Sequence, residues 1–111
     1  MNDNFSCIKL TQGKACIVDP DRLEALKKFT WRAVQAKRSW YAKADIQTKN
    51  GKVTICMHRF IAQTHFGDVC HHINGNSLDN RKSNLINMSK KEHDLHHKNN
   101  KILIKYAPAA G

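Results

Sequence analysis

Apolar and polar residues alternate over several short runs of the chain, a pattern typical of strands with one buried face. Residues 5–11 and 15–18 form two such runs around Gln12-Gly13-Lys14, so this segment predicts a β-hairpin. Asp19-Pro20 follows, with a capping residue before a proline that suits the first helical position. A helix is therefore expected over residues 20–29. It should bury Leu23, Leu26 and Phe29.

The middle of the chain predicts three further strands, at 31–36, 40–47 and 52–57. Short turns separate these strands, including Asn50-Gly51, so they should form one antiparallel sheet. The apolar spacing then becomes helical over 58–66, and Gly67 is well placed to end that helix.

The last patterned segment predicts a strand, a loop, a strand and a helix. The strands are expected at 68–73 and 83–88, with a turn signal at Asn74-Gly75-Asn76. Ser89 and Glu92 have the spacing of a capping box, which begins a helix that should run to Asn99.

This order of elements predicts the α+β class. A small N-terminal antiparallel sheet with a helix is expected over residues 1–57, as a lobe of its own. The strand–strand–helix unit should occupy 58–99, and 100–111 should be a flexible tail.

Charge narrows the choice of partner. The 111 residues include 19 Lys and Arg against 9 Asp and Glu, a net charge of +10 without the histidines, and 41% are hydrophobic. This balance excludes an acidic disordered chain and indicates a polyanionic partner, either nucleic acid or an anionic membrane. No basic amphipathic helix, no run of roughly 20 apolar residues and no signal peptide is evident. Nucleic acid is therefore favoured over a membrane, in a cytoplasmic protein.

The cysteines give no sign of a zinc or disulfide framework. Cys7, Cys16, Cys56 and Cys70 form no C-x-x-C pair, and each lies within an apolar run. We expect buried, reduced thiols, with a structural zinc or a disulfide as the lesser alternative.

Histidines are concentrated near the C-terminus, where six of the seven fall within residues 65–97. His93 and His97 are four apart on the expected helix and share a face, as two ligands of one metal would. His71 and His72 are adjacent on a strand and should face opposite sides. Taken alone, each pair is more often a solvated surface feature than a site. His58 and His65 are assigned to packing or surface roles.

Taken together, these residues resemble the HNH (ββα-metal) nuclease motif. His71-His72 stand on the first strand, Asn84 begins the second, and His93 follows on the helix. The segment Asn74-Gly-Asn-Ser-Leu-Asp-Asn-Arg-Lys-Ser-Asn-Leu85 resembles the loop of phage- and intron-encoded HNH homing endonucleases.

The resemblance implies a role for each residue. His72 matches the general base and Asn84 the residue that orients it. His71, His93 and His97 match metal ligands. The phage family usually has Asp where this chain has His71, and often Asn where it has His93, so the ligand set looks more like that of the colicin-type nucleases. One divalent ion is implied (Mg, Mn, Ni, Co or Zn), and imidazole ligands favour the borderline metals over Mg.

The basic residues of the expected sheet suit phosphate contacts. Segments from Ile8 to Met57 also resemble the N-terminal part of many phage HNH endonucleases, which is similar to the three-stranded DNA-binding sheet of plant ethylene-responsive factors. This resemblance implies that the lobe formed by residues 1–57 binds DNA. Trp31 and Trp40 are more often packing residues than base-stacking ones. The candidate DNA-binding residues are Lys37, Arg38, Trp40, Lys43, Lys52, Arg81 and Lys82.

The expected function is a metal-dependent DNA endonuclease that leaves 5′-phosphate and 3′-hydroxyl ends. Its substrate would be double-stranded DNA in a bacterial or phage-infected cell, and it would act as a monomer or homodimer with no obligatory protein partner. The alternative is a non-catalytic DNA-binding regulator that keeps the fold around a structural metal. A toxin nuclease would share the chemistry.

Overall fold

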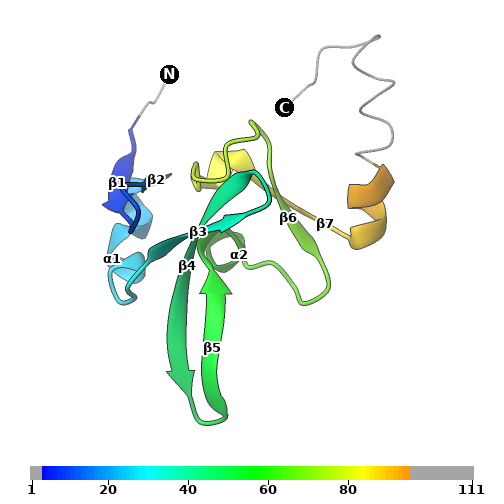
Figure 1. The fold of residues 1–111 in the computed structure, drawn as a ribbon. Coiled ribbons are helices and arrows are strands. Elements are labelled where there is room, and N and C mark those ends of the chain that lie inside the picture. Colours follow the sequence, from blue (N-terminus) through cyan, green and yellow to red (C-terminus); the bar gives the residue numbers. More distant parts are fainter. Residues whose placement is uncertain (1–3, 96–111) are drawn as a thin grey trace.

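Strands form in all the alternating segments, and each pairs with a neighbour in the chain (Figure 1). The computed structural model describes residues 4–95. In that range one hairpin, one three-stranded sheet and a second hairpin are all antiparallel. The strands are β1 (Ser6–Lys9), β2 (Ala15–Val18), β3 (Arg32–Ala36), β4 (Ser39–Thr48), β5 (Gly51–Cys56), β6 (Val69–His72) and β7 (Leu85–Met88). The expected α+β class is confirmed, while its metal-binding unit stays a prediction.

The first helix is shorter than expected. A 3-10 turn, η1 (Pro20–Arg22), leads into α1 (Leu23–Leu26). The helix ends there because the indole of Trp31 donates to the carbonyl of Leu26 at 2.8 Å, which fixes the chain in a turn. The side chain of Asp19 was expected to cap this helix, but it makes no capping hydrogen bond. It instead accepts a hydrogen bond from the backbone N–H of Lys82 at 2.8 Å. Leu26 is fully buried, and Leu23 and Phe29 are partly buried.

The second helix, α2 (Met57–Ala62), also stops early. Gln63, and not Gly67, ends it in the left-handed conformation, with φ of 52°. The following loop is stabilised from within the helix, because the guanidinium of Arg59 donates to the carbonyls of Asp68 at 2.7 Å and His65 at 3.1 Å. No helix in the described part of the chain has the length and apolar character needed to cross a bilayer.

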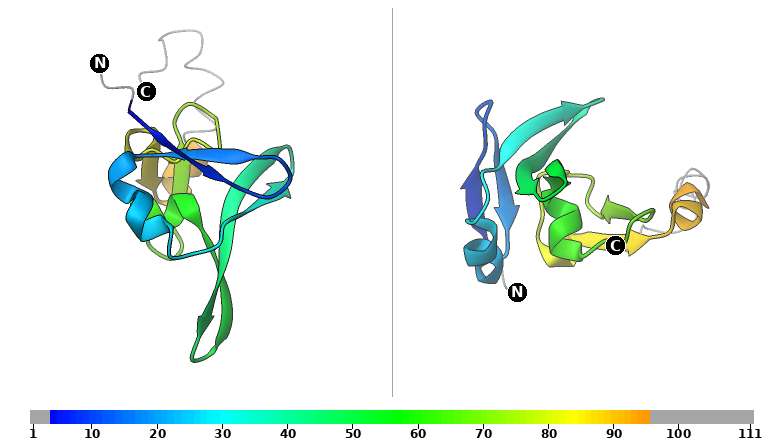
Figure 2. Two further views of the ribbon diagram at one scale, coloured as in Figure 1. Left: turned by 90° about the vertical axis from the view of Figure 1, so that its left-hand side faces the viewer. Right: turned by 90° about the horizontal axis from the view of Figure 1, so that it is seen from below.

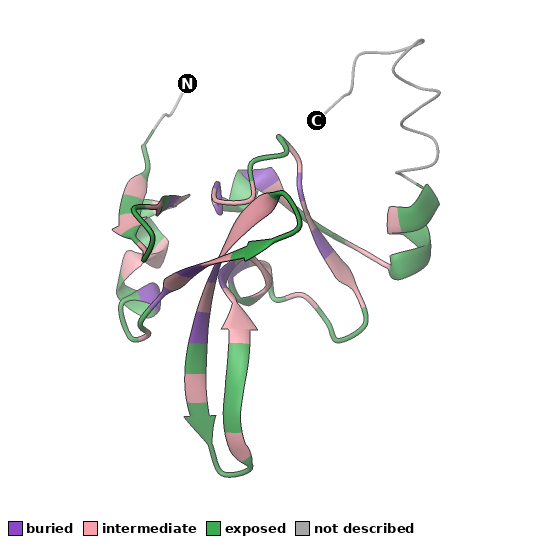
Figure 3. Ribbon diagram, viewed as in Figure 1, coloured by how far each residue is buried: buried purple, intermediate pink, exposed green. Residues whose placement is uncertain are grey.

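The core lies where β2, α1, the three-stranded sheet and α2 meet (Figure 3). α2 contacts β4, β5, β6 and β7, so it joins the sheet to the second hairpin. Ile61 is buried in the same cluster as Val18 and Ala44, and Leu78 and Leu85 pack against that cluster. The core is thus formed by residues from both sides of position 57. The lobe boundary expected at that position stays a prediction.

The long loop between β6 and β7 is fastened to the N-terminal hairpin. Ile17 of β2 donates from its backbone to Leu78 at 2.8 Å and accepts from Asn80 at 2.7 Å, which makes a short parallel bridge. The Ser77 hydroxyl donates to the carbonyl of Trp40. These contacts fix the position of the loop that precedes the second strand of the predicted site.

All four cysteines are free, and two of them fit the expectation of buried thiols. Burial raises the pKa of Cys16 to about 11 and also raises the pKa of Cys70. Cys7 is exposed, against expectation, because it occupies an outward position of the edge strand β1.

Candidate functional site

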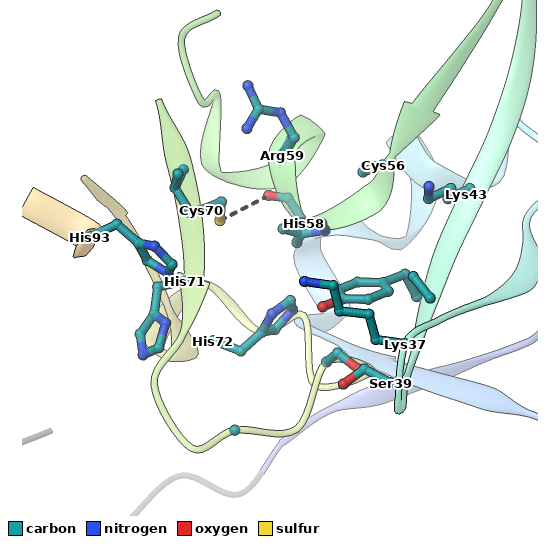
Figure 4. Close-up of a pocket in the computed structure, with 15 residues that line it drawn as sticks. Lys37, Ser39, Lys43, Cys56, His58, Arg59, Cys70, His71, His72 and His93 are labelled. Carbon is teal, nitrogen blue, oxygen red and sulfur yellow. Dashed lines mark hydrogen bonds between the residues drawn. The ribbon is translucent and has the colours of Figure 1, made fainter. Parts of the chain in front are cut away.

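Strand alternation places the two adjacent histidines on opposite faces of β6. Cys70 and His72 are buried, while Val69 and His71 are less so. Figure 4 shows His71 beside His93 on one side of the strand, and the His72 ring pointing from the other side toward His58. The pair therefore has two different surroundings, and the two rings cannot do the same work.

His72 is 8% exposed and lies among aromatic rings. Its ring centroid is 4.9 Å from that of His58 and 6.3 Å from that of Tyr41. Its Nε2 lies 2.8 Å from the side-chain oxygen of Asn80. Burial lowers the pKa of His72, an effect that the Asn80 hydrogen bond and the charge of Asp79 partly oppose. The ring is therefore neutral at pH 7, as a general base must be.

His58 is one residue of this site that sequence reasoning missed. It stands in the first turn of α2, directly after β5, and lines the same cavity as His72. Burial is the main cause that lowers its pKa to about 4, and the charges of His72, Arg59 and Lys43 add to it. A lone histidine at a strand–helix junction carried no signal that pointed inward. His65, assigned with it, is exposed.

These side chains surround a cavity of about 700 Å³ between the β3–β4 turn, α2 and β6 (Figure 4). Its long cationic side chains are Lys37, Lys43 and Arg59. Its imidazoles are His58, His71, His72 and His93. No Asp or Glu is among the described residues that line it. Such a lining suits a phosphate group, because fixed positive charge at partly dehydrated positions attracts anions strongly.

His71 and His93 form the described part of the predicted metal site. Their rings meet edge to face with centroids 5.9 Å apart. His93 is positioned by the predicted capping box, in which Ser89 and Glu92 exchange backbone hydrogen bonds at 2.9 and 3.0 Å to begin the helical residues 90–95. His97, the third expected ligand, lies outside the described residues. Within residues 4–95, no group of three or more metal-ligating side chains converges. Two imidazoles side by side fit a borderline divalent ion.

Asn84 makes no side-chain hydrogen bond to His72, although the resemblance implied that it orients this ring. Its side chain accepts from the backbone N–H of Asn74 at 2.9 Å and donates to the Asn74 side chain and to the carbonyl of Asp79, each at 2.9 Å. The loop brings Asn80 to the ring instead. Asn84 thus fixes the path of the loop, and Asn80 contacts the candidate base.

Asp79 is a second buried polar residue of the β6–β7 loop. It is 2% exposed and forms a two-point ion pair with Arg81, at 2.9 and 2.8 Å. The Arg81 guanidinium holds the pKa of this carboxyl below its usual range. Arg81, predicted to contact DNA, is therefore engaged in stabilising the loop.

The other predicted DNA-binding residues are spread over the surface. Lys37 and Lys43 line the cavity, and Arg38 and Lys82 are exposed. The β4–β5 hairpin extends beyond the core (Figures 1 and 2). Lys52 belongs to β5, and its ammonium lies 3.8 Å from the Asp45 carboxylate. Trp40 is half-buried, with the Lys14 ammonium 4.9 Å from its ring centroid. The structure thus brings two of the seven into contact with the candidate site.

No protein-family model, curated protein or solved structure matches this chain. The likeness to HNH nucleases therefore depends on the residues and their arrangement alone.

Proposed function

We propose that the protein is a metal-dependent DNA endonuclease of the HNH type. The observation that carries the proposal is His72, a buried, neutral imidazole that lies in a cationic cavity beside the His71–His93 pair. A neutral imidazole can accept the proton of an attacking water, and the cations around it can bind the phosphodiester.

Each described residue then has a distinct task. His72 accepts a proton from water, which becomes the nucleophile. Lys37 and Lys43 hold the phosphate in the cavity. His71 and His93, together with His97, would hold one divalent ion. That ion, when bound, supplies positive charge for the phosphoryl and leaving oxygens. Cleavage of the bond to the 3′-oxygen leaves 5′-phosphate and 3′-hydroxyl ends.

The test is cleavage of supercoiled plasmid with Mg, Mn, Ni, Co and Zn in turn. Wild-type protein should nick or linearise the plasmid with at least one of these ions. His72→Ala should lose cleavage and keep its affinity for duplex DNA, because the ring acts on water and not in binding. His65→Ala, which removes an exposed histidine, is the matched control and should cleave normally.

Protein that binds duplex DNA but cuts none across the metal panel would overturn the proposal and favour a non-catalytic regulator. The ligand assignment has its own measurement, calorimetric titration with Ni. His93→Ala should weaken Ni binding, and an unchanged affinity would remove His93 from the ligand set.

A further inference from the structure

The hydrogen bond between Asn80 and His72 determines which ring nitrogen of His72 can act. The Nε2 atom lies 2.8 Å from the Oδ1 atom of Asn80. With the amide oxygen facing the ring, as in this structure, Nε2 carries the proton, because an amide oxygen can only accept a hydrogen bond. In the neutral ring the other nitrogen, Nδ1, then holds the free electron pair.

Asn80 is held tightly enough to impose this choice. It is 1% exposed, and its backbone N–H donates to the carbonyl of Ile17 at 2.7 Å. Ile17 in turn donates to the carbonyl of Leu78 at 2.8 Å, so β2 fixes the backbone on both sides of Asp79. A buried side chain on a fixed backbone has few other rotamers.

We propose that Asn80 is the positioning residue of His72: its side-chain oxygen selects the Nε2–H tautomer, and Nδ1 is left to accept the proton of water. The hairpin β1–β2 supports this arrangement through Ile17. The N-terminal lobe then contributes to the geometry of the base as well as to DNA binding. The consequence for catalysis rests on the proposed nuclease function, whereas the tautomer does not.

The tautomer can be measured directly on full-length protein labelled with ¹⁵N at histidine, without metal or DNA. Long-range ¹H–¹⁵N correlation spectra at pH 7.5 should show His72 with a protonated Nε2 and an unprotonated Nδ1. Asn80→Ala should lose this preference, with the Nδ1–H form appearing. Asn80→Asp, which keeps an acceptor oxygen, should retain it. Asn87→Ala, on β7 with its side chain bonded to Thr64 and Ala62, is the control and should leave the His72 signals unchanged.

Two results would overturn the assignment. A protonated Nδ1 in the wild-type spectrum would mean that the amide donates to Nε2, and an unchanged tautomer in a folded Asn80→Ala protein would mean that another group selects it. If Asn80→Ala does not fold, the wild-type spectrum and that of Asn80→Asp still decide.

Cleavage assays separate this proposal from the proposed function. Asn80→Ala should lower kcat by about 10²-fold, with KM for DNA unchanged and partial rescue in Asn80→Asp. If the tautomer is as assigned but no variant or wild-type protein cleaves DNA, the nuclease function fails and the positioning role stands. If wild-type protein cleaves DNA and the tautomer is wrong, only the positioning role fails.

Discussion

At the scale of single residues, His58 shows how burial determines what a side chain can do in this cavity. Its pKa of about 4 means that the ring is neutral at pH 7, so it cannot bind phosphate as a cation. It instead packs beside His72, with ring centroids 4.9 Å apart. The cationic character of the cavity therefore comes from the lysines and Arg59.

The same shift predicts an acid sensitivity of folding. The folded pKa of His58 is about 4, against an ordinary value of 6.5, so between these pH values the unfolded chain binds more protons. Stability should therefore fall as pH is lowered from 6.5 to 4. His58→Phe removes this titration, so its Tm should fall less than that of the wild type between pH 6.5 and 4. The lowered pKa of His72 leaves part of the pH dependence of stability in place. Calorimetry at pH 7, 6, 5 and 4 tests this, and equal slopes in both proteins would contradict it.

Replacing Asn84 is expected to lower the stability of the fold. It is 7% exposed and makes three hydrogen bonds at 2.9 Å, all within the β6–β7 loop. Asn84→Ala removes the partner of the Asn74 backbone N–H and of the carbonyl of the buried Asp79, and it should cost about 2 kcal/mol in the free energy of unfolding. Asn87→Ala, at an exposed position of β7, should cost less. Urea denaturation of the two variants checks this, and equal losses would argue against a special role for Asn84.

The sequence did not reveal that Asn80, and not Asn84, makes the hydrogen bond to His72. The loop composition and the turn residues indicated a structured segment, and the histidines indicated its chemistry. Which amide reaches His72 depends on the path of the loop, and that path depends on hydrogen bonds to Ile17 and Trp40, far away in the chain. No local pattern carries that information.

At the scale of elements, the same distinction separates correct from incorrect boundaries. The hairpins and the capping box at Ser89 were predicted well because their signals are local. Both helix lengths were overestimated because side-chain hydrogen bonds, which the apolar spacing does not reveal, fix the turns that follow the helices. Trp31 engages the carbonyl of Leu26, and Arg59 engages the loop after α2. Asp19 looked like a helix cap but bonds to Lys82, 63 positions away.

The capping box predicts a link between a helix start and metal binding. Ser89 and Glu92 satisfy each other's backbone N–H groups, so Ser89→Ala should destabilise the helix that carries His93 by about 1 kcal/mol. The site would then have to order this helix on binding, and Ni affinity should fall severalfold. Lys90→Ala, an exposed change in the same helix, should bind Ni as wild type does. Calorimetric titration measures the Ni affinity of both variants. Equal affinities would show that the capping box does not contribute to metal binding.

At the scale of the whole molecule, the net charge of +10 would act on the proposed DNA substrate at a distance, whereas the cavity would act only at contact. The two contributions respond differently to salt. A lysine that neutralises a phosphate releases a counterion, so its removal lowers the slope of log Kd against log salt by about 1. A lysine elsewhere changes the overall field and leaves that slope nearly unchanged.

Lys43 and Lys27 make the comparison possible. Lys43 lines the cavity, while Lys27 lies after α1, 3.9 Å from Glu24, and is not among the cavity residues. Each change to Ala removes one positive charge, so the net charge of the two variants is the same. We expect a smaller salt slope and weaker binding for Lys43→Ala alone, measured by fluorescence anisotropy on a labelled duplex from 50 to 200 mM salt, roughly the range over which such contacts show. Equal slopes for both variants would mean that the DNA does not bind at the cavity. The phosphate that His72 is proposed to act on would then lie elsewhere.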